Sequence, residues 1–452
     1  MELSLYRKGT SPRARARGLK GRSLAAPLAL GVLGSCVLLL NGQDARADGF
    51  LDDSKLTLTL RNYYFGSDRR NGRADQKDWT QGFLLDYQSG FTQGTVGLGV
   101  DAFGYLGMKL DAGFGRRGTG NLPIHAGNEP ADEYSRAGAA AKLRLGQTVV
   151  RYGQQLPTAP VFAISTSRLV PQSATGWSLL STDIPDLTLE AGHFTSGTDQ
   201  VSTNRDGDLW AGYARRRADH VDFAGGKYKL AEGVSLSLYA AQLDDIWNQY
   251  YGNFNLVRPL SATQSLTFDG NLYRTRDTGA ADAGPIDNTS YSLAAAYSHG
   301  PQTFTLGWQR IDGDTPFDYI GMGDNGRTGG GLFLGNASMF SDFNAPGERS
   351  WQARYDLNFK TLGVPGLSLM TRYIKGTDID GSHLPVGSAY RGMYGADDQE
   401  RELNLEGRYV VQAGSAKGLS IRVRQAWHRG SLSTGGSVDQ LRVIVDYPLR
   451  LL

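Results

Sequence analysis

The sequence predicts an all-β protein, an 18-stranded antiparallel transmembrane β-barrel with a constriction loop folded into its lumen. Three observations support this fold class. Apolar and polar residues alternate with a period of two in segment after segment, the polar positions carry many charges, and the connections alternate between short and long.

The alternation is clear in the segment 55–61, where Leu56, Leu58 and Leu60 share one face and threonines and basic residues share the other. Successive side chains of a strand point to opposite faces, so this strand has one apolar and one polar side. The same pattern returns in 234–239, 303–308, 419–424 and 441–447. A soluble sandwich turns its apolar face onto a second sheet, whereas a barrel in lipid turns that face outward around a polar interior.

The predicted strands number 18, and the weaker pattern of 175–181 is not counted. An even number lets an antiparallel sheet close with both chain ends at one rim. Closure matters because an open edge in lipid leaves backbone N–H and C=O groups unpaired. The expected strands are 54–65, 79–90, 93–109, 133–145, 147–153, 186–194, 207–216, 219–229, 234–243, 246–258, 261–274, 288–298, 302–312, 348–360, 366–375, 400–412, 418–430 and 437–447.

The connections between these segments fall into two length classes. Short ones lie at 146, 299–301, 364–366 and 413–417. Long, polar ones lie at 110–132, 154–174, 195–206, 275–287, 313–347 and 376–399. Short turns at one rim and long loops at the other are typical of outer membrane barrels.

Residues 1–47 have the pattern of a signal peptide. Basic residues come first, an apolar stretch runs from Leu24 to Leu40, and Ala45-Arg46-Ala47 forms a small-x-small cleavage site. The alternative is a membrane anchor. Cleavage removes Cys36, the single cysteine, so the domain 48–452 has neither disulfides nor thiolate metal sites.

The basic balance of the chain is a property of its N-terminus. Eight Lys/Arg and two Asp/Glu lie in residues 1–47, so residues 48–452 carry 39 basic and 43 acidic side chains. We therefore expect no nucleic acid partner. The histidines show no metal-ligand spacing, and no cofactor is expected.

Arginines at polar-face positions are the strongest candidate site. A guanidinium group is always charged, and its planar fork fits a carboxylate through two parallel hydrogen bonds. A row of them offers a carboxylate successive weak sites, as conduction requires. The alternative is pairing with lumenal acids, namely Asp356, Glu402, Glu406 or Asp446. The arginines expected in the lumen are Arg61, Arg144, Arg354, Arg372, Arg408, Arg422, Arg424 and Arg442.

The segment 154–174 is a long connection that is unusually rich in Leu, Val, Phe and Ile. Exposed loops seldom carry so many large apolar side chains together, so we expect this one to fold into the lumen and narrow it. Arg168 then lies at the constriction. The alternative is a loop packed on the outer rim.

Several segments, in order, resemble the OprD-type substrate-specific porins of pseudomonads. They are 48–56 with 60–65, Arg151-Tyr152-Gly153 before Leu156-Pro157, 167–172, 342–346 with Ser350-Trp351, 365–367 with Arg372-Tyr373, and 445–448. The resemblance runs from Asp48 to the end of the chain. The one departure is the C-terminus, Leu451-Leu452, where such barrels commonly end in an aromatic residue.

The resemblance implies a lumenal ladder of basic residues opposed by acids, and passage of small carboxylate nutrients such as amino acids or aromatic acids. A basic residue follows the proline segment of the inward loop in that family, which matches Arg168. The ladder positions match Arg61, Arg69, Arg205, Arg354 and Arg424.

We therefore expect a passive channel and not an enzyme, with small carboxylate solutes and outer membrane lipid as its partners. The alternative is a barrel enzyme or adhesin whose lumen is filled. The preferred carboxylate stays open, and so does the choice between a monomer and a weak homotrimer.

Overall fold

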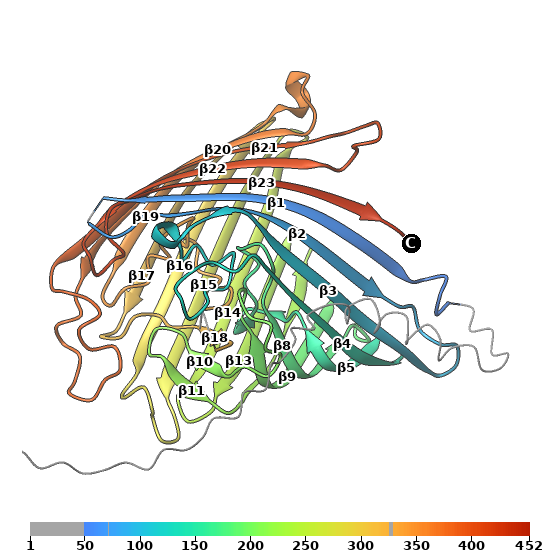
Figure 1. Ribbon diagram of the computed structural model, residues 1–452, viewed down its shortest axis with the longest axis horizontal. Coiled ribbons are helices and arrows are strands. Elements are labelled where there is room, and N and C mark those ends of the chain that lie inside the picture. Colours follow the sequence, from blue (N-terminus) through green and yellow to red (C-terminus); the bar gives the residue numbers. More distant parts are fainter. Residues whose placement is uncertain (1–48, 71, 325–328) are drawn as a thin grey trace, which may run out of the picture. The chain divides into compact units, whose positions relative to one another are not determined.

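The computed structural model describes residues 49–70, 72–324 and 329–452. They form a closed antiparallel sheet of 18 strands (Figure 1), which confirms the predicted fold class. The signal peptide predicted at 1–47 lies outside the described residues. Within these ranges, no helix is both long and apolar enough to cross a membrane.

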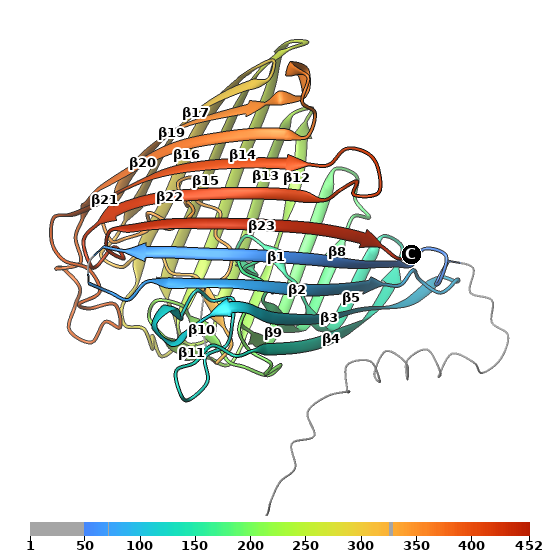
Figure 2. The same cartoon turned by 45° about the horizontal axis from the view of Figure 1, so that its top comes forward.

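Closure comes from the two ends of the sheet. β23 (Val438–Arg450) pairs with β1 (Lys55–Arg69), with Arg61 opposite Asp446 (Figure 2). The other barrel strands are β2 (Gln76–Gln88), β3 (Val96–Ala112), β4 (Glu133–Leu145), β5 (Thr148–Gln155), β8 (Ser173–Ser181), β9 (Leu187–Thr198), β12 (Val221–Ala231), β13 (Val234–Leu243), β14 (Trp247–Ser261), β15 (Gln264–Asp277), β16 (Asp287–His299), β17 (Gln302–Asp312), β19 (Arg349–Asn358), β20 (Leu367–Ile379), β21 (Asp398–Val410) and β22 (Ser420–Gly430).

The connections between barrel strands contain short strands and turns of their own. β6 (Thr158–Ala159) pairs with β7 (Phe162–Ala163), and β10 (Leu209–Ala211) lies between β11 (Arg216–Ala218) and β18 (Ile320–Met322). Two 3-10 turns, η1 (Phe114–Arg116) and η2 (Phe359–Leu362), complete the described elements.

One predicted strand was wrong and one omitted segment is a barrel strand. The segment 207–216 forms only β10 inside a loop, because Leu209 and Ala211 are fully buried in a packed loop core and do not face lipid. The omitted segment 175–181 lies in β8. Its pattern is weak because the register shifts at Gly176 and because the adjacent apolar residues Leu179 and Leu180 break the alternation. The count of 18 is right because the two errors cancel.

The connections sort by length as predicted. Short turns join β4 to β5, β12 to β13, β14 to β15 and β16 to β17 at one rim. The opposite rim carries the long connections 113–132, 156–172, 199–220, 313–348 and 380–397, together with the shorter 70–75, 244–246, 278–286 and 431–437. Long loops of such barrels face the outside of the cell, so this rim is the extracellular one.

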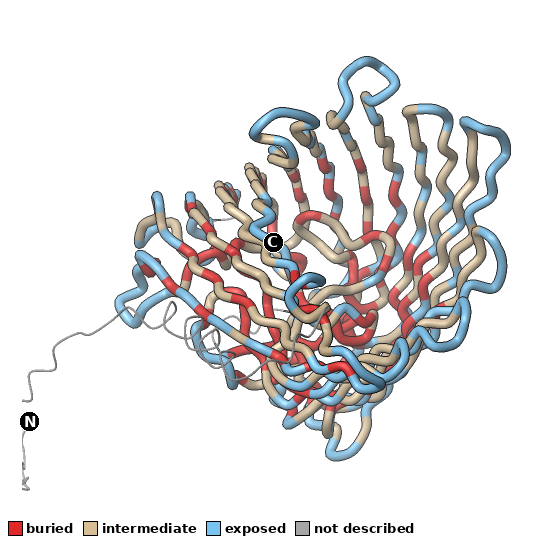
Figure 3. The backbone as a smooth tube through the Cα atoms, turned by 90° about the vertical axis from the view of Figure 1, so that its right-hand side faces the viewer, coloured by how far each residue is buried: buried red, intermediate tan, exposed pale blue. Residues whose placement is uncertain are grey.

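Burial follows the same geometry. Large apolar side chains such as Leu238, Leu293 and Leu306 are exposed on the outer face, as a lipid-facing surface requires. Buried residues gather on the inner face and where loops pass inside the barrel (Figure 3). Loops of the chain therefore fill part of the lumen, and they determine the width of the channel that remains.

Candidate functional site

The connection from β5 to β8, residues 156–172, enters the lumen and is called the constriction loop. Its first half packs on the inner wall formed by β9 and β12: the ring of Phe162 lies 5.1 Å from that of Phe194 and 6.2 Å from that of Phe223. Val161, at 4% exposure, belongs to the same cluster. The predicted inward fold of this loop is confirmed.

The second half of the constriction loop reaches the wall formed by β1–β3. Leu169 is fully buried against Tyr63 and Phe65. Gly82 and Gly107 make room for it, since a Cβ at either glycine would lie 3.1 or 3.0 Å from a Leu169 methyl carbon. The loop therefore spans the lumen, because its two halves pack against separate parts of the wall.

Arg168 precedes Leu169, the residue that holds the constriction loop against this wall. Its Nε donates to the carbonyl oxygen of Thr119 at 2.7 Å, and its guanidinium carbon lies 5.3 Å from the centre of the Phe65 ring. Arg61 supports the same turn by donating from Nη1 to the Arg168 carbonyl oxygen at 3.2 Å. The backbone and side chain of Arg168 are thus both fixed.

A second loop, residues 313–348, also enters the lumen, which the sequence analysis did not predict. The carbonyl oxygens of Ala337 and Met339 accept from Arg372 and Arg442 at 3.1 and 2.8 Å. The sequence could have predicted this, because the loop contains several large apolar residues. Ile320, Met322, Leu334 and Phe343 are all nearly or fully buried. That apolar content is the feature that identified the constriction loop.

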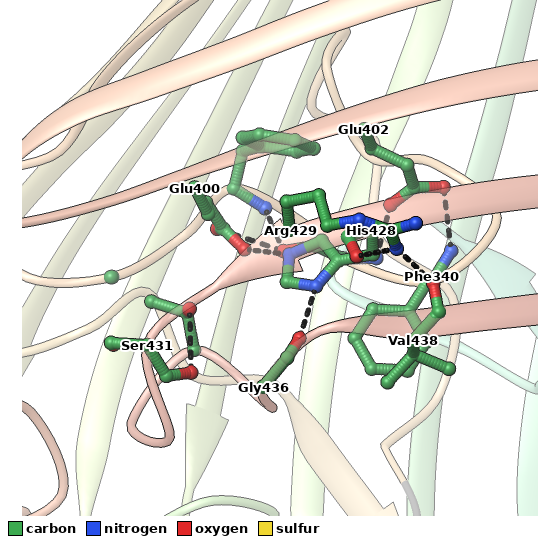
Figure 4. A network of polar contacts seen from close by, with 12 residues as sticks. Phe340, Glu400, Glu402, His428, Arg429, Ser431, Gly436 and Val438 are labelled. Atoms are coloured by element: carbon green, nitrogen blue, oxygen red, sulfur yellow. Dashed lines mark hydrogen bonds and ion pairs between the residues drawn. The ribbon is translucent and has the colours of Figure 1, made fainter. Parts of the chain in front are cut away.

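The second loop is fixed to the wall through a polar network (Figure 4). The backbone amides of Phe340 and Ser341 donate to the carboxylate of Glu402 at 3.1 and 2.9 Å. The Ser341 hydroxyl donates to Glu400 at 2.8 Å, which in turn lies 2.7 Å from Nε2 of His428. One patch of β21 and β22 therefore holds this loop.

His428 also anchors the connection between β22 and β23. Its Nδ1 lies 2.7 Å from the carbonyl oxygen of Gly436 (Figure 4). A carbonyl oxygen only accepts, so Nδ1 carries the hydrogen. His428 thus links the β22–β23 connection to the carboxylate of Glu400.

The arginines of β1 and β19–β23 share the inner face and form the arginine wall. In the strand register, Arg354 lies opposite Arg372, Arg408 opposite Arg422, and Arg424 opposite Arg442. Like charges directly opposite each other on neighbouring strands destabilise a sheet. The members of the wall are Arg61, Arg354, Arg372, Arg408, Arg422, Arg424 and Arg442.

Acids neutralise only part of the arginine wall. Arg61 pairs with Asp446 at 2.7 Å, Arg354 with Asp356 at 2.7 Å, and Arg424 with Glu406 at 2.9 Å, with Arg422 more distant from Glu406 at 3.8 Å. The predicted alternative of acid pairing is thus realised for these members, although Glu402 binds loop amides and not an arginine.

The remaining members have only neutral partners, or none, among the described residues. Arg372 donates to Asn404 at 3.2 and 3.0 Å and to the Ala337 carbonyl, and Arg442 donates to Gln440 at 2.8 Å and to the Met339 carbonyl. Arg408 is exposed on the inner face. Of these three, Arg372 and Arg442 are buried beneath the loop 313–348, and Arg408 is exposed to the lumen.

Three predicted arginines lie apart from the wall. Arg144 stacks over the Phe91 ring at 4.6 Å near the short-turn rim. Arg69 ends β1 at the extracellular rim, where Nη2 donates to Gln76 at 3.0 Å. Arg205 is exposed in the loop 199–220. The structure does not bring these residues together with the others.

Three lumenal carboxylates form no ion pair in the described chain: Asp269 on β15 and Glu190 on β9 lie away from the arginine wall, and Asp86 lies on β2 beside β1. Asp269 accepts from the amides of Asn253, Asn255 and Asn271 at 3.2, 2.9 and 2.7 Å. Glu190 accepts from the hydroxyl of Tyr239 at 3.4 Å, and Asp86 from that of Tyr105 at 2.6 Å. The lumen therefore has a basic side and an acidic side.

The extracellular loops share a buried acid. Asp318 accepts from the backbone amides of Tyr213 and Ala214 at 2.9 and 3.1 Å and from the hydroxyl of Tyr390 at 3.1 Å. Burial raises the pKa of Asp318 to about 6. Three long loops are tied together at this carboxyl group, which supports the constriction from the outside.

Comparison with known proteins gives a consistent result. The family model described as outer membrane porin, OprD family, matches residues 48–451. Porin D of Pseudomonas aeruginosa is 55% identical over 414 residues, 90% of this chain and 93% of that protein. The porin-like protein GalP of Pseudomonas putida is 36% identical, over 90% of this chain and 95% of that protein.

Solved structures agree. The crystal structure of Pseudomonas aeruginosa OprD has a TM-score of 0.79 and 52% identity, over 90% of this chain and 98% of that one. The crystal structure of Pseudomonas aeruginosa OpdK with vanillate has a TM-score of 0.78 and 35% identity, over 89% of this chain and 100% of that one. The chain therefore belongs to the OprD family of outer membrane porins, channels of the outer membrane that pass small molecules.

Proposed function

We propose that this porin selects small solutes by their carboxylate group, which the arginine wall attracts, and that amino acids are its preferred class. The observation that carries the proposal is the set of three arginine pairs that face each other across neighbouring strands. Such pairs cost stability, and only some of their members have an acid beside them. An anion in the lumen relieves this repulsion.

The placement of the pairs supports transfer from one to the next. Each pair lies two residues along the strand from another pair in the register of β20–β23, a step of about 7 Å. A carboxylate leaves one guanidinium as it meets another, so no single site holds it tightly. Partial neutralisation by Glu406 and Asp356 weakens each site further, which favours passage over trapping.

The acidic side of the lumen supports amino acids over simple anions. Asp269 and Glu190 lie across the lumen from the arginine wall and Asp86 lies at its edge, and an ammonium group on the solute is attracted to these carboxylates. A zwitterion therefore finds a partner for each of its charges. OpdK was solved with vanillate, an aromatic carboxylate, and this supports the carboxylate part of the proposal.

The two inward loops set the size limit. The constriction loop and the loop 313–348 both pack on the wall through buried side chains, so they exclude bulky solutes without closing the barrel. The alternative of a barrel enzyme or adhesin requires a lumen that passes no solute.

Swelling of liposomes that contain the purified porin tests the proposal. We expect an amino acid to enter faster than its carboxamide and faster than a neutral sugar of similar size. Equal rates for the three would contradict carboxylate selection, and no swelling with any of them would favour the filled barrel. The variant Arg349→Gln is a matched control, because Arg349 lies outside the lumen and pairs with Asp378.

A further inference from the structure

An open hollow lies on the outside of the barrel. It has a volume of about 550 Å³ and spans β8, β9 and β12–β14. Phe223 and Ala241 point inward to the loop core, so their neighbours Ala224 and Ala240 face outward. The hollow is therefore open to the membrane and separate from the channel.

The hollow continues toward the short-turn rim as a groove. An adjoining hollow of about 520 Å³ shares Leu179, Ala191 and Ala224 with the first. Together they follow β9 from His193 to Leu187, about 20 Å of strand. We call this combined surface the outer groove. It has the length and apolar character that fit an extended hydrocarbon chain.

Small residues form the floor of the outer groove and large ones form its sides. Ala191, Ala224 and Ala240 face each other in register across β9, β12 and β13. Trp177 and Tyr250 stand beside them with about half of their surface exposed, at 52% and 53%. A barrel surface that only contacts fluid lipid needs no such depression, because lipid chains adapt to a smooth wall.

The extracellular end of the outer groove is polar. His193 lies 2.8 Å from Asp222, and His220 lies 3.2 Å from the other oxygen of the same carboxylate and 3.5 Å from Asp244. These groups form a polar cap at the level where a barrel of this kind meets the headgroups of the outer leaflet.

The loop that leads into β12 carries exposed basic residues a few positions before the polar cap. Arg215 and Arg216 are exposed, and they precede His220 by no more than five residues, within about 18 Å of extended chain. Arg276 is exposed on the outer face and lies opposite Asn248, which lines the groove. No ion pair within 4 Å is formed by these three arginines in the part of the chain that the structure describes, although Arg276 lies opposite Asp287 in the register of β15 and β16.

We propose that the outer groove binds one acyl chain of an anionic, phosphorylated lipid of the outer leaflet, and that Arg215, Arg216 and Arg276 bind its phosphate groups. The apolar groove suits a hydrocarbon chain, and exposed guanidinium groups without an ion pair within 4 Å suit phosphate groups. Three arginines exceed what one phosphodiester neutralises, so a lipid with more than one negative charge fits best.

Native mass spectrometry of the folded porin in detergent, titrated with lipid A, tests this proposal. Lipid A serves as the probe because it carries two phosphates and several acyl chains, and phosphatidylethanolamine serves as the comparison lipid. We expect one lipid A per chain and at least tenfold weaker retention of phosphatidylethanolamine.

Two kinds of variant separate the parts of the proposed site. Ala224→Leu and Ala240→Leu each fill the floor of the outer groove without reaching the lumen. We expect either variant to weaken the binding of lipid A at least tenfold. Arg215→Gln with Arg216→Gln is expected to reduce the preference for lipid A over phosphatidylethanolamine. Ala295→Leu is the matched control, because Ala295 is an exposed alanine on the outer face of β16, away from the groove.

Two outcomes would overturn the proposal. Unchanged lipid A binding in both floor variants and in the double arginine variant would show that the groove does not hold the lipid. A change in the number of copies per particle, with no change in lipid binding, would make the groove an interface between copies. Neither outcome affects solute selection, since the groove and the arginine wall lie on opposite faces of the sheet.

Discussion

Arg442 on β23 lies directly opposite Arg424 on β22, and only Arg424 has a carboxylate beside it, that of Glu406 at 2.9 Å. Arg442 is nearly buried, and its charge is met by the Met339 carbonyl and the Gln440 side chain. A buried charge without an ion pair is costly, and the hydrogen bonds of Arg442 to Met339 and Gln440 offset part of that cost.

Neutralising Arg442 is expected to reduce the anion preference of the channel. In Arg442→Gln, one positive charge leaves the arginine wall while a polar side chain remains. The reversal potential in a KCl gradient across a planar bilayer should move toward cation selectivity. Arg349→Gln, outside the lumen, should leave it unchanged, and an equal shift in both variants would contradict a specific role for Arg442.

Shortening Leu169 is expected to loosen the constriction loop. Leu169 is fully buried between Tyr63, Phe65 and the glycines of β2 and β3, so Leu169→Ala leaves a cavity and weakens docking by about 2–5 kcal/mol. Single-channel recording should show larger and noisier conductance. Leu306→Ala on the lipid-facing surface is the control, and identical traces for the two variants would show that Leu169 does not hold the loop.

The loop 313–348 is expected to be held more firmly at mildly acidic pH. Burial raises the pKa of Asp342 to about 6, against the lowering effect of the Tyr319 hydroxyl, and the charges of Glu402 and Glu400 add to the rise. Between about pH 4 and 6 the folded state binds more protons than the unfolded state, so stability falls as pH rises through this window.

Limited proteolysis of this loop at pH 5 and pH 7.5 measures the effect. Cleavage should be slower at pH 5, relative to an unstructured substrate of the same protease. Asp342→Asn, which cannot ionise, should remove most of the difference. Faster cleavage of the wild-type loop at pH 5 than at pH 7.5 would contradict the claim that protonation of Asp342 stabilises the docked loop.

Export is expected to remove residues 1–47. The family match begins at residue 48, directly after the small-x-small site that ends at Ala47. N-terminal sequencing of the porin from isolated outer membranes should start at Asp48. A start upstream of Leu24 would show that the apolar stretch is retained as an anchor.

The sequence predicted the barrel well because period-two alternation is a local property of each strand. It failed at 207–216, where the apolar residues pack in a loop core inside the barrel, and at β8, where the alternation is interrupted. In β8 the register shifts at Gly176 and Leu179 lies next to Leu180, whereas at Leu209 an apolar pattern serves a packed core.

The candidate site was predicted in outline but not in detail. Alternation placed Arg372, Arg408 and Arg442 on the inner face, since orientation depends only on parity along a strand. The pairing of one arginine with another depends on strand register, and the contacts at Ala337 and Met339 depend on the fold of a long loop. Neither can be obtained from the local pattern.

The central claim is tested most directly by the permeability of an amino acid relative to its carboxamide, measured in liposomes with the wild type and with Arg372→Gln/Arg408→Gln/Arg442→Gln. These three arginines lack an acidic partner in the described structure, so their loss removes the unneutralised charge of the arginine wall. We predict that the amino acid permeates several times faster than the amide in the wild type and that the triple variant brings the ratio close to one. A ratio that stays the same in the triple variant would contradict selection by the arginine wall.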